Sequence, residues 1–153
     1  MLNILDPRGI RNNNPGNIRL STSLWQGQSL VQEDGVFVEF ITPLYGLRAL
    51  MRTLLTYYLK YELNTVLSII NRYAPPYENA TDTYIYAVEK ALNVKRTDKI
   101  DLRSKDMLIS LTQAIVLHEN GTPPADRPAG WYDPSIYDQA AALALVLVAP
   151  VTA

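Results

Sequence analysis

Apolar residues recur at helical spacing through most of the chain after residue 42. The dipeptide Thr42-Pro43 is a typical helix start, with Thr as the capping residue and Pro in the first turn. Apolar side chains then recur three or four positions apart, at Leu44, Leu47, Met51, Leu54 and Tyr58. This spacing places them on one face, so the pattern predicts a helix with one buried side.

Four further helices are predicted, over residues 64–74, 79–94, 105–120 and 133–149. Pro75 and Pro76 end the first of these, since proline cannot continue a helix. Asn79 or Thr81 is expected to cap the next one.

The last two helices carry the clearest end signals. Ser104 is expected to cap the helix over 105–120, and Gly121 suits its C-terminal end. Asp133 followed by Pro134 predicts the start of the final helix.

The first 35 residues differ from the rest because turn-forming residues dominate them. The run RNNNPGNIR over 11–19 combines Asn, Pro and Gly, which favour turns for different backbone reasons. The β-branched and aromatic run over 35–42 predicts a short strand that pairs with residues 17–21. The predicted fold is therefore a single, mainly α domain over 1–153, with about five helices and a small β-hairpin near the N-terminus.

Composition narrows the function classes. A chain of 153 residues with 48% apolar and 19% charged residues can bury one sizeable core. It has no cysteine and a single histidine, so thiolate and histidine-rich metal sites are excluded and no cofactor is expected.

Charge and hydropathy narrow the partners. A net charge of −1 argues against nucleic acid as a partner. The N-terminus has no long apolar stretch, so no signal peptide is predicted. The longest apolar run, over 140–150, is about half the length that spans a bilayer, so a core helix is expected there and no membrane span.

Glu119 stands out because it continues the apolar face of its helix. Leu108, Leu111 and Ile115 form one stripe, and Glu119 follows four residues after Ile115. Partial burial and the negative end of the helix dipole both favour a protonated carboxyl, as a general acid requires. The alternative is a frayed last turn with a solvated glutamate. His118, at the edge of the stripe, is expected either to contact a substrate or to cap the helix end.

Three more groups of residues are candidates for binding or catalysis. Asn13, Asn14 and Asn17 carry amides that suit sugar hydroxyl and acetamido groups, although Asn also favours turns for local reasons. Tyr73 and Tyr84 lie in a tyrosine-rich stretch, where aromatic rings either stack on sugars or pack in a core. Asp34 is the first candidate for a second catalytic carboxylate, beside the acids Glu33 and Glu39, unless these residues are solvated or form turns.

Several motifs together resemble the phage virion and prophage muramidases of the lysozyme superfamily. They are RGIRNNNPGNIR, Trp25 with Gly27, Asp34 followed by FVEF, YGLRAL, YAPPYENATDTYIYAV and AIVLHENG. The likeness extends to soluble lytic transglycosylases, whose catalytic glutamate also ends a helix before a small-residue turn. In that superfamily the glutamate helix normally comes first, so the resemblance implies a circularly permuted lysozyme-like domain with an inserted stretch over 122–133.

The resemblance implies a function as well as a fold. It implies cleavage of the β-1,4 bond between N-acetylmuramic acid and N-acetylglucosamine, with Glu119 as the acid and the asparagines and tyrosines as glycan contacts. It also implies a phage virion protein, with possible contacts to other virion proteins, that acts on peptidoglycan in the host periplasm or cell wall. The alternative is a catalytically inactive glycan-binding or structural virion protein. The catalytic reading requires Glu119 to lie within roughly 10 Å of residues 13–18, with a cleft between them.

Overall fold

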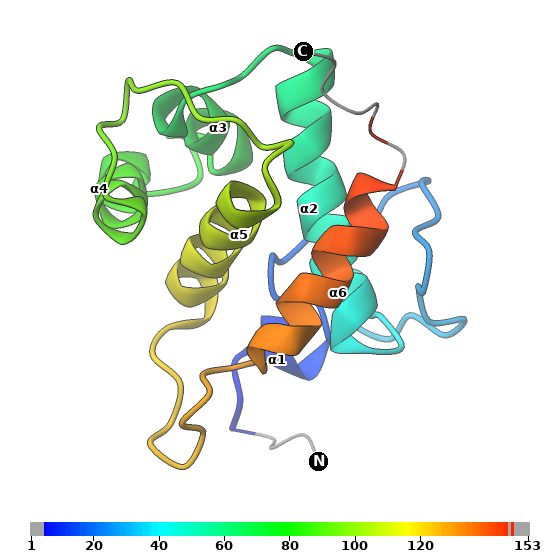
Figure 1. The fold of residues 1–153 in the computed structure, drawn as a ribbon. Helices are drawn as coiled ribbons and strands as arrows, with labels where there is room; N and C mark the ends of the chain where they lie inside the picture. The colour runs from blue at the N-terminus through cyan, green and yellow to red at the C-terminus, as the bar shows by residue number, and fades with distance from the viewer. Residues whose placement is uncertain (1–4, 147, 149–153) are drawn as a thin grey trace.

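A computed structural model of the protein describes residues 5–146 and 148 (Figure 1). The regular secondary structure of this part consists of helices and two isolated β-bridges, and the spacing of apolar residues predicts the longer helices. Its helices are α1 (Arg8–Arg11), α2 (Pro43–Lys60), α3 (Val66–Tyr73), α4 (Thr81–Leu92), α5 (Lys105–Asn120) and α6 (Pro134–Leu145). The five longer helices were predicted, whereas α1 is a single turn that the sequence pattern did not indicate. The predicted extension of the last helix to residue 149 falls partly outside the described residues.

The helices pack around one apolar core. Figure 1 shows α2 and α6 side by side, with α5 next to them and α4 on its far side, while α3 lies between α4 and α2. Leu54 of α2, Leu111 of α5 and Ala141 of α6 are all fully buried. The helix α5 therefore packs against α4 on one side and against α6 and α2 on the other.

The ends of the helices follow local side-chain chemistry. Ser104 accepts a hydrogen bond from the Met107 amide, and Asp133 accepts one from the Ser135 amide, so both predicted caps are confirmed. The cap predicted for α4 at Asn79 or Thr81 is wrong: Ala80 is the capping residue. The Thr81 hydroxyl donates instead to the Ala74 carbonyl, a bond that closes the turn between α3 and α4.

The predicted hairpin is not formed as a pair of strands. Residues 17–21 and 35–42 do approach each other, but the described residues contain only two isolated antiparallel bridges, Arg19 with Phe37 and Gln28 with Phe40. The Asn14 side chain bonds to the backbone of Ile18 and Val38. Side-chain amides thus occupy positions that a strand partner would otherwise fill, and the ladder does not extend.

Within the described residues, none of the helices has both the length and the hydropathy needed to cross a membrane.

Candidate functional site

Glu119 lies in the last turn of α5. Its carboxylate meets the asparagine-rich loop over residues 11–19, called the asparagine loop below. The side chain is partly buried, and its Oε1 accepts a hydrogen bond from Asn17 Nδ2 at 3.1 Å. The two residues are 102 positions apart in sequence, so only the tertiary fold brings them together. The predicted proximity of Glu119 to residues 13–18 is confirmed.

A pocket of about 400 Å³ opens at this contact. Its walls come from separate parts of the chain: the asparagine loop, Phe37, α2, the end of α3 with the turn that follows it, and the end of α5. The lining residues are Gly16, Asn17, Ile18, Arg19, Phe37, Thr53, Tyr57, Arg72, Tyr73, Ala74, Pro75, Glu78, Asn79 and Glu119. A concave site of this size with one partly buried carboxylate can hold a small ligand or part of a polymer.

Backbone geometry aims Asn17 at Glu119. Asn17 adopts a left-handed conformation with φ of 53°, which asparagine tolerates better than most residues. Its amide N–H donates to the Asn14 carbonyl at 3.0 Å, and this bond closes the Pro-Gly turn. The Tyr73 hydroxyl donates to the Gly16 carbonyl from the opposite wall. The loop is therefore fixed immediately before the residue that meets the glutamate.

The other two predicted sugar-binding asparagines have structural contacts instead. Asn14 is fully buried, and its side chain bonds to Ile18 and Val38, so it cannot reach a glycan. Asn13 donates to the Phe40 carbonyl and does not line the glutamate pocket. The amide of Asn14 therefore shapes the loop, and a contact of Asn13 with substrate stays a prediction.

Tyr73 and Tyr84 approach the glutamate from α3 and α4. Burial raises the pKa of the Tyr73 hydroxyl, and the nearby charge of Glu119 raises it further. The same two causes raise the pKa of Tyr84. Tyr73 lines the pocket. Tyr84 is only 2% exposed and does not line it, so Tyr84 belongs to the buried packing next to Glu119.

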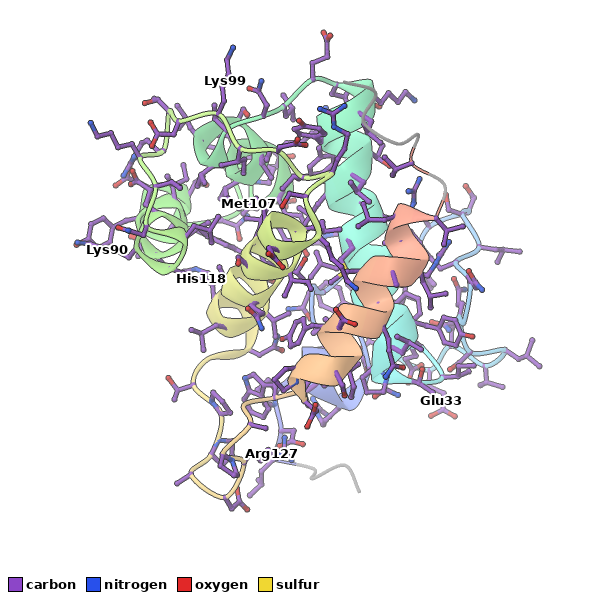
Figure 2. All side chains as sticks on the ribbon, in the orientation of Figure 1. Glu33, Lys90, Lys99, Met107, His118 and Arg127 are labelled. Atoms are coloured by element: carbon purple, nitrogen blue, oxygen red, sulfur yellow. The ribbon has the colours of Figure 1, made fainter. Side chains whose placement is uncertain are left out.

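His118 is exposed on the surface of α5. Figure 2 shows it on the side of α5 that faces α4, and its ring stacks on Tyr84 with centroids 3.8 Å apart. It is not among the residues that line the pocket. In this structure His118 packs against Tyr84, and a contact of His118 with substrate stays a prediction.

Asp34 is fully engaged in shaping the loop. Both of its carboxylate oxygens accept hydrogen bonds from Arg8 at 2.6 Å, and one also accepts from the Asn12 side chain. The Val36 and Phe37 amides donate to it as well. The Arg8 guanidinium and these amides hold the pKa of Asp34 well below its usual range. Asp34 is not among the residues that line the pocket, and a catalytic role for it stays a prediction.

Three charged residues that line the pocket were not predicted as site residues. Arg19 and Arg72 each lie over aromatic rings, with the Arg72 guanidinium carbon 3.9 Å from the Tyr61 ring centroid. Glu78 comes from the turn between α3 and α4. Glu78 lies within the tyrosine-rich stretch, but its sequence position does not show that it faces a pocket. Among the described residues, no cluster of His, Asp or Glu side chains is arranged to hold a metal ion.

Comparison with known proteins finds a phage relative. The chain is 39% identical over 120 residues to Protein P5 of Pseudoalteromonas phage PM2, a match that covers 76% of this chain and 73% of that protein. No family model matches the sequence.

Proposed function

The chain belongs to the family of Protein P5 of Pseudoalteromonas phage PM2, and we propose that it is a virion-associated muramidase that cleaves host peptidoglycan. The observation that supports this proposal most directly is the hydrogen bond from Asn17 to Glu119 at the wall of a pocket. In a helical domain that has no functional site, nothing requires a polar loop to contact a glutamate so distant in sequence. The proposal also rests on the resemblance of the NNNPGNI and HENG motifs to lysozyme-superfamily enzymes.

In this proposal Glu119 is the general acid. Asn17 donates to Oε1 of the carboxyl group, which leaves the other oxygen to carry the acidic proton. That proton passes to the oxygen of the β-1,4 bond between N-acetylmuramic acid and N-acetylglucosamine as the bond breaks. Tyr73 fixes the loop through Gly16, so the amide of Asn17 stays in place while the substrate binds.

Substitution of Glu119 tests the proposal. Glu119→Gln keeps the size of the side chain and an oxygen that can accept from Asn17, but it removes the acidic proton. We expect a loss of at least about 100-fold in the rate at which purified cell walls clear, with an unchanged melting temperature. Glu33→Gln is the matched control, since Glu33 is exposed and lies far from His118 in Figure 2, at the edge of the loop region. Clearing by folded Glu119→Gln at the wild-type rate contradicts the assignment.

A structural role in the virion is the second candidate. The segment over residues 20–41 exposes several large apolar side chains, at Leu24, Leu30, Val31 and Ile41. Exposed apolar side chains that gather on one segment are typical of protein contact surfaces. A zymogram on purified peptidoglycan separates the two candidates, because a purely structural protein binds or assembles without clearing the substrate.

A further inference from the structure

The pocket beside Glu119 contains a second carboxylate. Glu119 reaches it from the end of α5, and Glu78 reaches it from the turn between α3 and α4. Among the described residues that line the pocket, Glu78 and Glu119 are the acidic ones. A glycosidase that hydrolyses its substrate requires such a pair, one group as the acid and the other as the base or nucleophile.

The turn that carries Glu78 is fixed by its own backbone. The Glu78 amide donates to the Pro75 carbonyl at 3.0 Å, and the Asn79 side chain donates to the same carbonyl at 3.2 Å. Proline restricts the backbone at both 75 and 76. Thr81 ties the end of the turn back to Ala74. The backbone position of Glu78 on the pocket wall is therefore well defined.

The Glu78 side chain, by contrast, does not help to hold the described part of the fold together. It is exposed and makes no hydrogen bond or ion pair with any described residue, so both of its oxygens are available to water or substrate. The other candidate acids are already engaged. Asp34 is held by Arg8, and Glu39 accepts hydrogen bonds from the backbone amides of Glu33 and Asp34.

We propose that Glu78 is the general base of a hydrolytic reaction in which Glu119 is the acid. This inference rests on the muramidase function proposed above. As Glu119 gives its proton to the glycosidic oxygen, the bond from that oxygen to the anomeric carbon breaks. A water molecule bonds to the anomeric carbon and gives one proton to the Glu78 carboxylate. The products are a reducing sugar and a free 4-hydroxyl on the leaving sugar, and solvent then returns a proton from Glu78 to Glu119. One water is consumed, and no other reactant is needed.

The position of Glu78 favours the role of base over that of nucleophile. It stands on a different element from Glu119 and is exposed, so a water molecule can reach its carboxylate from solvent. In inverting glycosidases the two carboxyl groups are farther apart than in retaining ones, to leave room for that water. A lytic transglycosylase needs no such base, because a hydroxyl of the sugar itself attacks and a 1,6-anhydro sugar results.

The product and the variants test this inference together. Wild-type protein is incubated with purified peptidoglycan in water enriched in oxygen-18, and the fragments are analysed by mass spectrometry. We expect reducing ends that carry the heavy oxygen. Glu78→Gln should lower the rate at least about 100-fold with an unchanged melting temperature, while Glu33→Gln keeps the wild-type rate. Glu78→Ala should regain activity with sodium azide and release a glycosyl azide, which a merely structural residue does not produce.

Failure of this inference differs from failure of the proposed function. If wild-type protein releases 1,6-anhydro sugars, or if Glu78→Gln cleaves at the wild-type rate, Glu78 is not the base while Glu119 remains the acid. If wild-type protein leaves peptidoglycan intact under all conditions, both proposals are overturned.

Discussion

The helical part of the molecule and the loop segment over residues 7–41 are held together by different forces. In the helices the buried residues are almost all apolar, as with Leu54, Leu111 and Ile115, and burial of their surface is the main source of stability. The loop segment has a small apolar cluster of its own around Val38 and Phe40, and buried polar side chains add to it. Asn14 and Asp34 hold backbone amides and carbonyls that have no helical partner.

This difference explains why asparagines gather at one place in the sequence. They look like sugar-binding residues, yet most of them replace the backbone hydrogen bonds that a helix or sheet would supply. Only Asn17 turns its amide toward Glu119. A rigid polar loop is thus docked on an apolar helical core, and the candidate site lies where the two regions meet.

The largest expected effect comes from separating the two regions at Gly46 of α2. A Cβ at this position would overlap the Asn13 carbonyl, so the loop rests directly on the helix backbone. Without that contact, Gly46→Ala would stabilise the protein by about 1 kcal/mol through helix propensity. We expect instead a destabilisation of about 3 kcal/mol, because the loop must move away. Urea denaturation measures the sign, and Thr56→Ala, on the exposed side of α2, is the control. A more stable Gly46→Ala variant contradicts the close contact.

A somewhat smaller effect is expected inside the loop region. Asn14→Ala removes three hydrogen bonds and leaves the Ile18 amide and the Val38 carbonyl without a partner, while the Ile18 carbonyl keeps its bond from the Val38 amide. We expect a loss of about 2–3 kcal/mol and faster hydrogen exchange at the Ile18 amide.

A control is available in α3. Asn71 is exposed, and its side chain bonds only to the Leu67 carbonyl one turn earlier. Asn71→Ala should change stability by no more than about 0.5 kcal/mol. If the two variants lose equal stability, the amide of Asn14 does not have the structural role described here.

The sequence predicts the helical region much better than the loop region. Each of the longer helices repeats apolar residues at helical spacing, and Ser104 and Asp133 mark helix starts through local chemistry. The hairpin was predicted from the same kind of pattern, over residues 35–42, and was wrong. Period-two patterns record which side chains are buried, but they do not reveal that a side chain such as Asn14 will take the place of a strand.

The candidate site divides in the same way. Glu119 could be found because it continues a helical stripe, and its contact with the asparagine loop followed from the resemblance to a family. The sequence could not predict which asparagine contacts Glu119 and which ones bond to the backbone. Asn13, Asn14 and Asn17 have the same chemistry, and only the folded turn decides where each side chain points. Glu78 was overlooked as a site residue because pocket walls form from segments that are distant in sequence. Its free side chain can be recognised only once the other acids have been assigned partners.

The smallest effect, and the one most specific to the loop region, depends on pH. Arg8 and several amides hold the pKa of Asp34 well below its ordinary value, so folding favours the ionised form. A carboxyl with a lowered pKa in the folded state contributes its stability above the pKa of the unfolded chain, which is about 4, and loses it as the pH falls below that value. At pH 7 we expect Asp34→Asn to lower the urea midpoint, because Arg8, itself exposed, loses the charged partner that accepts two of its hydrogen bonds. Between pH 4 and pH 2 the wild type should lose this advantage, and the urea midpoints of the two proteins should converge. The apolar helical core has no such titration, so Leu111→Ala should remain less stable than wild type by a similar margin at both pH values. A gap between wild type and Asp34→Asn that stays constant from pH 7 to pH 2 contradicts the role of the ionised carboxylate in holding the loop.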